Sequence, residues 1–249
     1  MLRTRLVWLP VQSKDFSRCA GFFHSRRRQM KPWSNSYIPA LGYRCLTRFY
    51  DPVVRLTTRE ATFKDALLRE ASIQDGYRIL DLGCGTGTLA LLVKRAHRGA
   101  EVFGLDADAE ILKLARLKLD AAGIEVQLDQ GVASALPYAG ESFDRILSSL
   151  FFHHLTSELK VDAMREVLRV LRLGGECHIA DWGKPTSPVM RLAFVGVQLL
   201  DGFATTTDNL RGRLTGFLGL AGFENVETTN CFSTLLGTVS LYRARKPFI

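Results

Sequence analysis

The sequence has few cysteines, and none of them lie close together. Its 249 residues contain five, and the widely spaced set is Cys19, Cys45, Cys84, Cys177 and Cys231. Zinc sites and disulfide frameworks need cysteines at short or paired spacings, so this set argues against both and for a reducing compartment. We therefore expect no bound metal and a cytoplasmic protein.

A long apolar run is missing as well. The best candidate, Val189–Leu200, contains Arg191 and falls short of the ~20 residues that a membrane-spanning helix needs. We therefore expect a soluble protein, and peripheral contact with a membrane surface stays open.

Acidic residues are nearly absent from the first part of the chain. Residues 1–29 contain seven Lys or Arg residues and one acid, Asp15, so most of the formal net charge of +8 lies there. Because the rest is close to neutral, we expect no nucleic-acid partner. We interpret residues 1–30 as a basic, disordered leader. Its composition also suits a mitochondrial transit segment, and Met30 is an alternative start. A basic leader would also favour an anionic membrane surface.

Strand-like and helix-like segments alternate from Tyr77 onward. The expected strands are Tyr77–Leu82, Glu101–Asp106, Glu125–Asp129, Arg145–Ser149 and Glu176–Asp181. The expected helices between them are Thr88–His97, Ala109–Ala122 and Glu158–Arg172. This alternation predicts an α/β fold with a doubly wound, mostly parallel sheet that helices cover on both faces.

The two ends of the chain depart from this alternation. Residues 31–75 read as an N-terminal helical cap, because apolar residues recur at helical spacing before Ala71. Near the other end, a helix around Asn209–Ala221 precedes two strand-like runs, "NVETTNCF" and "TVSLYRAR", which predict an antiparallel hairpin. We expect one domain over residues 76–249, with an apolar lid insertion over about residues 183–208.

The first expected strand leads into three glycines spaced two residues apart, Gly83, Gly85 and Gly87. Dinucleotide-binding loops follow G-x-G-x-x-G instead and would need a glycine or alanine at the position of Thr88. An acid, Asp81, precedes the loop, and its charge would repel a pyrophosphate but attract an ammonium group. The loop therefore favours a ligand with a positive amino group over a dinucleotide.

The stretch "ILDLGCGTGTLA" resembles motif I of the class I S-adenosylmethionine-dependent methyltransferases, which include the type 11 and the ubiquinone–menaquinone biosynthesis enzymes. The similarity extends from Tyr77 to Asp181. It implies a Rossmann-like, seven-stranded fold, S-adenosylmethionine as the cofactor, and a ribose-binding role for Asp106. The cofactor-binding residues that the resemblance implies are Asp81, Gly83, Cys84, Gly85, Gly87, Asp106, Ala107, Val132 and Ala133.

Two positions of this set need comment. Members of the family often have an acid, which accepts from the adenine amino group, where this chain has Val132. Ala133 can still donate its backbone N–H to the ring, and Gln130 or Asp129 could supply the missing acceptor. We interpret Cys84 as a small residue in a tight turn and not as a nucleophile.

The residues after the fourth and fifth strands are the candidates for chemistry. His153 and His154 follow the fourth strand, and imidazole suits proton abstraction near neutral pH. We expect one of them to contact the substrate or act as a base. Since they are adjacent, we do not expect both rings to face the same way. Trp182 is a candidate for stacking on an aromatic acceptor, with a core role as the alternative.

The function that follows is in-line methyl transfer from S-adenosylmethionine to a small, apolar acceptor. Quinone-like or lipid-like acceptors suit the apolar lid. The Asn-Phe-Arg-type signature of the ubiquinone/menaquinone enzymes is absent after the fourth strand, so no single acceptor follows. A non-catalytic S-adenosylmethionine-binding partner protein and a nicotinamide-dependent oxidoreductase are the alternatives. The methylated atom and the oligomeric state stay open.

Overall fold

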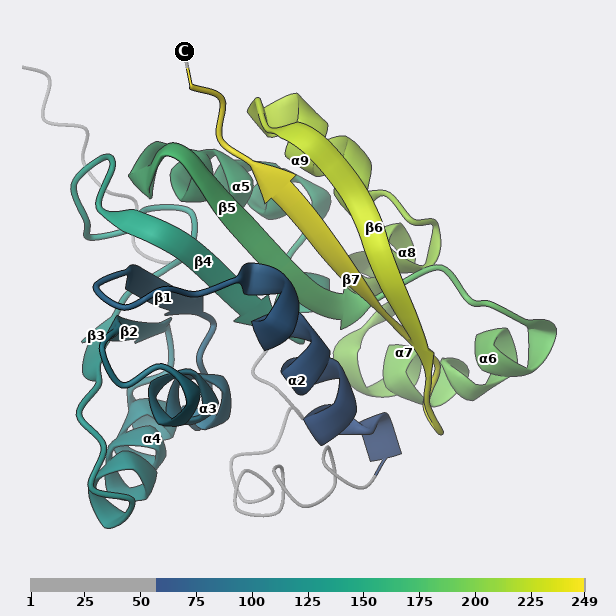
Figure 1. Ribbon diagram of the computed structural model, residues 1–249. Helices are drawn as coiled ribbons and strands as arrows, with labels where there is room; N and C mark the ends of the chain where they lie inside the picture. The colour runs from purple at the N-terminus through teal and green to yellow at the C-terminus, as the bar shows by residue number, and fades with distance from the viewer. Residues whose placement is uncertain (1–56, 249) are drawn as a thin grey trace, which may run out of the picture. The chain divides into compact units, whose positions relative to one another are not determined.

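The structure is a computed structural model that describes residues 57–248. Its centre is one seven-stranded sheet with the order β3-β2-β1-β4-β5-β7-β6 (Figure 1). The strands are β1 (Arg78–Leu82), β2 (Glu101–Asp106), β3 (Gln127–Gln130), β4 (Phe143–Ser149), β5 (Leu171–Trp182), β6 (Glu224–Ser233) and β7 (Thr238–Arg245). The sheet confirms the α/β fold that the alternation predicts.

Strands β1 to β5 are parallel, and β7 of the C-terminal hairpin runs against them. β7 pairs antiparallel with both β5 and β6, which confirms the expected hairpin. The order of the strands reverses between β1 and β4, because β2 and β3 extend the sheet on one side and β4 and β5 on the other. In open α/β sheets, loops diverge at such a point and leave a crevice at the carboxyl ends of the strands. The glycine loop that follows β1 lies at this crevice.

Helices cover both faces of the sheet. Helices α2 (Glu60–Ala71), α3 (Thr88–Ala96) and α4 (Ala109–Ala121) lie on one face, and α5 (Ser157–Val170) and α9 (Leu214–Ala221) lie on the other (Figure 1). Successive side chains of a strand point to opposite faces. Ile79 of β1 therefore joins the core cluster beneath α2 and α3, and Leu80 joins the cluster beneath α5 and α9. The sheet is buried on both faces at β1, as a doubly wound fold requires.

The expected boundary between the third helix-like segment, Glu158–Arg172, and the fifth strand is wrong. The helix ends at Val170, and β5 begins at Leu171 and not at Glu176. Leu171 already pairs with Phe143, and the register with β4 shifts before the next pair. Gly174 has a φ of +71° within this irregular stretch, a conformation that glycine adopts without strain. Gly174 and Gly175 therefore lie within a distorted part of β5 and not in a turn that precedes it.

The segment between β5 and β6 also differs from expectation. The single helix expected around Asn209–Ala221 is two helices, α8 (Phe203–Leu210) and α9, and Gly212 with a φ of +69° lies between them. Two further short helices, α6 (Pro188–Ala193) and α7 (Val195–Asp201), precede α8 at the place of the expected lid. The lid is thus built from three short helices in succession.

The leader lies outside the described residues, and only α2 represents the expected cap. The division into residues 1–30, 31–75 and 76–249 therefore stays a prediction. Within residues 57–248, no helix combines the length and the apolar character that crossing a bilayer requires.

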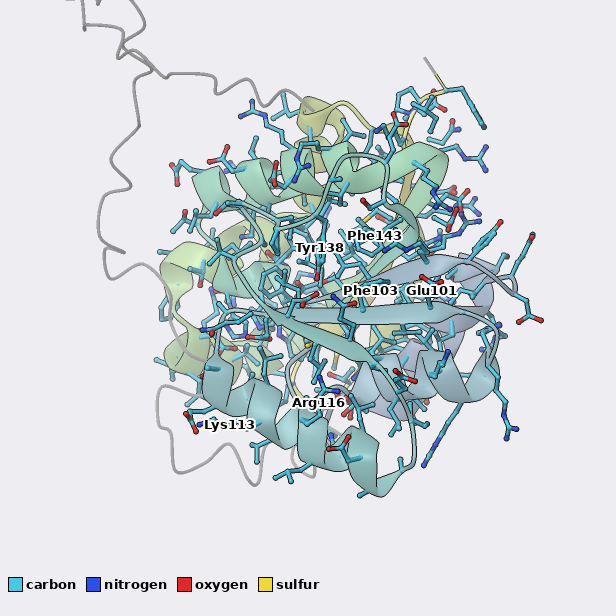
Figure 2. All side chains as sticks on the ribbon, turned by 90° about the vertical axis from the view of Figure 1, so that its left-hand side faces the viewer. Glu101, Phe103, Lys113, Arg116, Tyr138 and Phe143 are labelled. Carbon is cyan, nitrogen blue, oxygen red and sulfur yellow. The ribbon has the colours of Figure 1, made fainter. Side chains whose placement is uncertain are left out.

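Three aromatic rings close the core next to β1 and β2. The ring of Phe143, which is fully buried, lies 5.3 Å from that of Phe103 and 4.9 Å from that of Tyr138, both edge to face. Figure 2 shows these three side chains beside one another. The guanidinium carbon of Arg78 lies 4.9 Å from the centroid of the Phe103 ring. Each edge-to-face pair contributes about 0.5–1.5 kcal/mol beyond the area that it buries.

Replacing Phe143 by alanine should lower the free energy of unfolding by about 3–5 kcal/mol, because a large cavity would replace two aromatic contacts. Urea denaturation followed by circular dichroism measures this change. The matched control is Leu117→Ala on the exposed side of α4, for which we expect a change within about 0.5 kcal/mol. Equal effects of both substitutions would contradict this account of the core.

Candidate active site

The glycine loop is fastened to the end of β2. The backbone N–H groups of Gly83 and Cys84 both donate to the carbonyl of Leu105, at 2.8 and 3.0 Å. Gly83, Gly85 and Gly87 all have positive φ, at +69°, +52° and +73°. Side chains with a Cβ rarely adopt this conformation, so the sequence spacing of the glycines reflects a backbone requirement. The loop is a sharp turn from β1 into α3.

Space around the loop differs from one glycine to the next. A Cβ on Gly83 would lie 2.3 Å from the ring of Phe151, so the absence of a side chain there allows this ring to pack against the backbone. A Cβ on Gly85 would meet no atom within 4 Å. Gly85 therefore borders open space at the carboxyl end of the sheet, where a ligand can approach the backbone.

Asp106 is held with its carboxylate toward the same loop. Its Oδ2 atom accepts from the backbone N–H of Gly85 at 2.9 Å, and its Oδ1 atom accepts from Asp108 at 3.0 Å. Each carboxylate oxygen keeps a further lone pair after one such bond. Burial raises the pKa of Asp106, and the two backbone donors oppose that rise. The arrangement fits a group that offers two hydroxyls, as a ribose does.

Asp81 has a different setting from the one that its sequence position suggests. Its Oδ2 atom accepts from the backbone N–H of Ala90 in the first turn of α3, at 3.0 Å, so the carboxylate caps this helix. Burial raises its pKa to about 7, although the nearby charge of Lys64 lowers it. The contact with an ammonium group that the sequence suggests therefore stays a prediction.

Cys84 lies inside the loop with 7% of its surface exposed. Burial, together with the charges of Asp81 and Asp106, raises the pKa of its thiol well above the ordinary value. Because the thiolate is the nucleophilic form, the Cys84 side chain is unreactive at neutral pH. The structure thus agrees with a role in packing.

The residues expected near an adenine ring lie after β3. Ala133 is buried and Val132 is half-buried, and Gln130 donates its side-chain amide to the carbonyl of Ala107 at 3.2 Å. The carboxylate of Asp129 accepts from the hydroxyl of Tyr138 at 2.9 Å. Both side chains that could replace the missing acid therefore already make a contact of their own, Gln130 with Ala107 and Asp129 with Tyr138.

His153 is fastened to the end of β5. It lies in the short 3-10 helix η1 (Phe152–His154), and its Nδ1 atom is 2.6 Å from Oδ1 of Asp181. Its backbone N–H donates to the other oxygen of Asp181 at 3.1 Å. Oδ2 of Asp201, at the end of α7, lies 3.6 Å from Nε2 of His153. Burial lowers the pKa of His153, but the charges of Asp181 and Asp201 outweigh this effect and raise it. The protonated ring is therefore favoured between two carboxylates.

His154 has the opposite electrostatic setting. Its ring lies against that of His153, with the centroids 4.0 Å apart and the planes tilted by 41°. The expectation that the two rings face different ways is therefore wrong, because both are buried in the same tight turn. Burial, and then the charges of His153 and Lys160, lower the pKa of His154 well below its ordinary value. Its Nδ1 atom is buried and has no hydrogen-bond partner.

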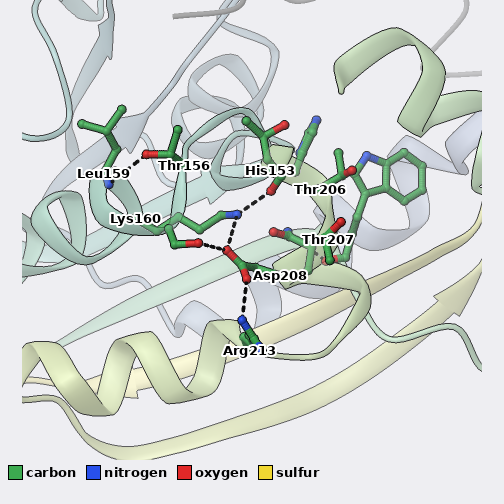
Figure 3. A network of polar contacts seen from close by, with 12 residues as sticks. His153, Thr156, Leu159, Lys160, Thr206, Thr207, Asp208 and Arg213 are labelled. Carbon is green, nitrogen blue, oxygen red and sulfur yellow. Dashed lines mark hydrogen bonds and ion pairs between the residues drawn. The ribbon is translucent and has the colours of Figure 1, made fainter. Parts of the chain in front are cut away.

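The lid is anchored beside these histidines by a buried ion pair. Lys160 of α5 is fully buried, donates to the carbonyl of Thr205 at 2.6 Å and lies 3.6 Å from Oδ2 of Asp208. Arg213 lies 3.2 Å from the other oxygen of Asp208 (Figure 3). These contacts join α5 to α8 and fix where the lid ends.

Sequence reasoning missed Asp201, Lys160 and Asp208. A signal for Asp201 is present, since it is the one acid in the otherwise apolar stretch "VGVQLLDGF". A charged side chain at such a place has to find a partner. For Lys160 and Asp208, neighbouring sequence contains no comparable signal, because each belongs to an ordinary helix surface pattern.

One group among the described residues has the chemistry of a metal site. Ligand atoms of His153, His154 and Asp201 all lie within 4.8 Å of one another. A protonated His153 has no free lone pair, so it would have to release a proton before it could bind a metal ion. The group is therefore suited first to holding and moving protons.

Trp182 is buried with 4% of its surface exposed. Its ring lies 5.1 Å from that of Phe194 and 6.3 Å from that of His153, both edge to face. Its backbone N–H donates to Asp181 at 2.7 Å. The ring therefore forms the wall between the histidines and the lid, and stacking on an acceptor stays a prediction.

A cavity of about 410 Å³ lies elsewhere, beside Glu176 of β5, the beginning of β6 and the end of β7. Its lining contains Glu176, Asn225, Val226, Glu227, Arg243 and Arg245. The arginines are already paired, Arg245 with Glu176 at 2.7 Å and Arg243 with Glu227. A hydrogen bond from His178, then Arg245, lowers the pKa of Glu176 to about 2. This cavity lies at the end of the sheet opposite the glycine loop and does not belong to the active site.

Known proteins resemble this chain in sequence and in fold. The profile of a methyltransferase domain matches residues 79–175. The ubiquinone/menaquinone biosynthesis C-methyltransferase UbiE of Xanthomonas campestris pv. campestris is 30% identical over 203 residues, which are 73% of this chain and 79% of that protein. The chain belongs to the class I S-adenosylmethionine-dependent methyltransferases. It is an enzyme whose cofactor is S-adenosylmethionine.

Two further proteins resemble this methyltransferase, one in sequence and one in fold. The demethylmenaquinone methyltransferase of Thermus thermophilus is 37% identical over 117 residues, and this alignment covers 47% of the chain but only 52% of that protein. The structure of an S-adenosylmethionine-dependent methyltransferase from Aquifex aeolicus superposes with a TM-score of 0.61 at 17% identity, over 81% of this chain and 97% of that one. The second likeness concerns the fold alone.

The raised pKa of Asp81 makes the stability of the methyltransferase depend on pH. The folded protein keeps a proton that the unfolded chain releases, so stability falls as the pH rises from about 4 to about 7. Asp81→Asn keeps an acceptor for Ala90 and does not titrate, so its stability should fall less. Urea denaturation of both proteins at about pH 5 and about pH 8 measures the difference. The matched control is Asp65→Asn, at an exposed acid of α2, whose stability should depend on pH as that of the parent does. If the stability of Asp81→Asn falls between the two pH values as much as that of the parent, the raised pKa of Asp81 is wrong.

Proposed function

We propose that the enzyme methylates a small, apolar acceptor that releases a proton in the reaction, and that His154 accepts this proton. The observation that carries the proposal is the Nδ1 atom of His154, which is buried, unpartnered and held neutral at the carboxyl end of β4. The two relatives named above are, by name, methyltransferases of demethylmenaquinone and of ubiquinone/menaquinone biosynthesis, which supports a quinone-like acceptor. Phe194 and Val197, which the lid turns inward, supply apolar walls.

The described residues fit the cofactor at three places. The open space at Gly85 lets a ligand approach the loop backbone, the carboxylate of Asp106 suits the ribose hydroxyls, and Val132 and Ala133 suit the adenine ring. When bound, S-adenosylmethionine supplies a sulfonium methyl group whose C–S bond breaks toward sulfur as the acceptor forms its new bond. The protein mainly has to align the two partners and exclude water.

The two histidines then have different roles. His154 is neutral near pH 7 and can take the acceptor's proton at Nδ1. His153, whose pKa the charges of Asp181 and Asp201 raise, is held by these two acids and positions the His154 ring that lies against it. The pair thus matches a phenol or an enolisable ring carbon better than an amine.

Calorimetry with S-adenosylhomocysteine tests the cofactor half. We expect Asp106→Ala to weaken binding at least about tenfold, because two hydrogen bonds to a charged acceptor disappear. Glu101→Gln, at the amino end of the same strand, should bind as the parent does. Unchanged binding by Asp106→Ala would sink the proposed ribose contact.

Turnover tests the acceptor half. Incubation of the protein with methyl-deuterated cofactor and a lipid extract, followed by mass spectrometry, identifies a labelled acceptor. With that acceptor, His154→Ala should lower kcat by about 10²–10⁴-fold and leave the KM for the cofactor unchanged. Because the pKa of His154 is lowered, the acidic limb of kcat in the parent should lie below about pH 6.5.

The matched control is His97→Ala, at the C-terminal end of α3 on the far side of the loop. It should leave kcat unchanged. Full activity of His154→Ala would refute the role of this histidine as a base, whereas the cofactor contacts at Asp106 would stand.

A further inference from the structure

The first part of the lid has an unusual distribution of apolar side chains. Helical hydrogen bonds continue from α6 into α7, since Phe194 donates to the carbonyl of Met190 at 3.2 Å and Gln198 donates to that of Phe194 at 3.0 Å. Phe194 itself has helical φ and ψ angles of −70° and −13°. The directions of the side chains of residues 188–201 can therefore be derived from the period of one continuous helix.

One side of this helical segment is apolar and exposed. At about 100° per residue, Val189, Leu192, Leu199 and Leu200 fall within about one quarter to one third of the helix circumference. Their exposed fractions are 69%, 74%, 71% and 61%. We call these four residues the lid stripe. Phe203, just after α7, is also exposed.

The opposite side of the segment is buried and carries its polar groups. Phe194, Val197 and Gln198 are almost fully buried, and Asp201 reaches Nε2 of His153 at 3.6 Å. An ordinary surface helix turns its polar side to water. Single exposed leucines are common on proteins, but a continuous stripe of large apolar side chains marks an interaction surface.

The exposed charges of the lid and of the residues that flank it are basic. The exposed cations among residues 183–213 include Lys184, Arg191 and Arg211, and Arg191 donates to the side chain of Gln198 at 3.0 Å. The two acids of these residues are turned inward, Asp201 toward His153 and Asp208 toward Lys160. An exposed apolar stripe on a segment whose exposed charges are basic is typical of a helix that lies in the interface of an anionic bilayer.

We propose that the lid stripe docks on the surface of an anionic lipid bilayer. The inference rests on the proposed function in one respect, namely that an apolar acceptor would partition into that bilayer. The inner side of the same helical segment reaches the histidines through Asp201. Docking would thus place the lid between the lipid phase and the active site.

Flotation of the full chain with vesicles tests the proposal. The vesicles are made of phosphatidylcholine alone or of phosphatidylcholine with phosphatidylglycerol. We expect the parent to float with the anionic vesicles and to be released by high salt. The double variant Leu192→Ser and Leu199→Ser should bind them at least about tenfold less, because two leucine side chains no longer enter the interface.

The matched control is the double variant Leu117→Ser and Leu220→Ser, which replaces leucines of comparable exposure, 67% and 72%, on α4 and α9. It should float as the parent does. Circular dichroism and calorimetry with S-adenosylhomocysteine should be the same for all three proteins, which separates docking from folding and from cofactor binding.

Three results would overturn docking on lipid. The first is a parent that stays unbound, and the second is a lid-stripe variant that floats as well as the parent, as binding through another part of the chain would give. The third is a concentration-dependent dimer of the parent, in sedimentation without lipid, that the lid-stripe variant no longer forms; the stripe would then contact a second copy. A failure of His154→Ala to lower turnover would leave the flotation result untouched.

Discussion

The buried carboxylate of Asp181 joins the elements from which the active site is built. It accepts from the backbone and the ring of His153 and from the backbone of Trp182, so the loop after β4 is held against the end of β5. Asp181 has no exposed surface, and a lone buried charge would be costly. The positive ring of His153 offsets that cost. The contact between Asp181 and His153 therefore positions both histidines. Through Asp201, which lies near His153, it also positions α7.

The ionisable groups next to Asp181 influence one another's protonation. His153 is favoured as a cation between two acids, and this cation in turn helps to keep His154 neutral. Lys160 and Asp208 form a second buried pair that fixes the base of the lid. An enzyme that must deprotonate its acceptor needs a base that is neutral near pH 7, and His153 contributes to this by lowering the pKa of His154.

Local signals explain which parts of the fold and the site were predictable. The glycine loop and the ends of β2 and α3 depend on nearby residues, and the sequence places them to within about one residue. The start of β5 depends on the pairing of Leu171 with Phe143 across the sheet, which no local pattern contains. The contact between His153 and Asp201 likewise exists only once the lid has folded over η1. The helix-capping role of Asp81 was missed because its partner, Ala90, offers only a backbone group.

The C-terminal hairpin has a practical consequence. Because β7 runs antiparallel to β5, the chain returns to the amino end of the sheet, where Lys246 bonds to the carbonyls of Gly175 and Leu171. Anything joined after residue 248 therefore emerges at the end of the sheet opposite His153. A reporter protein or an immobilisation tag attached there would leave the entrance to the catalytic crevice free and would hold the enzyme with its lid pointing away from the support.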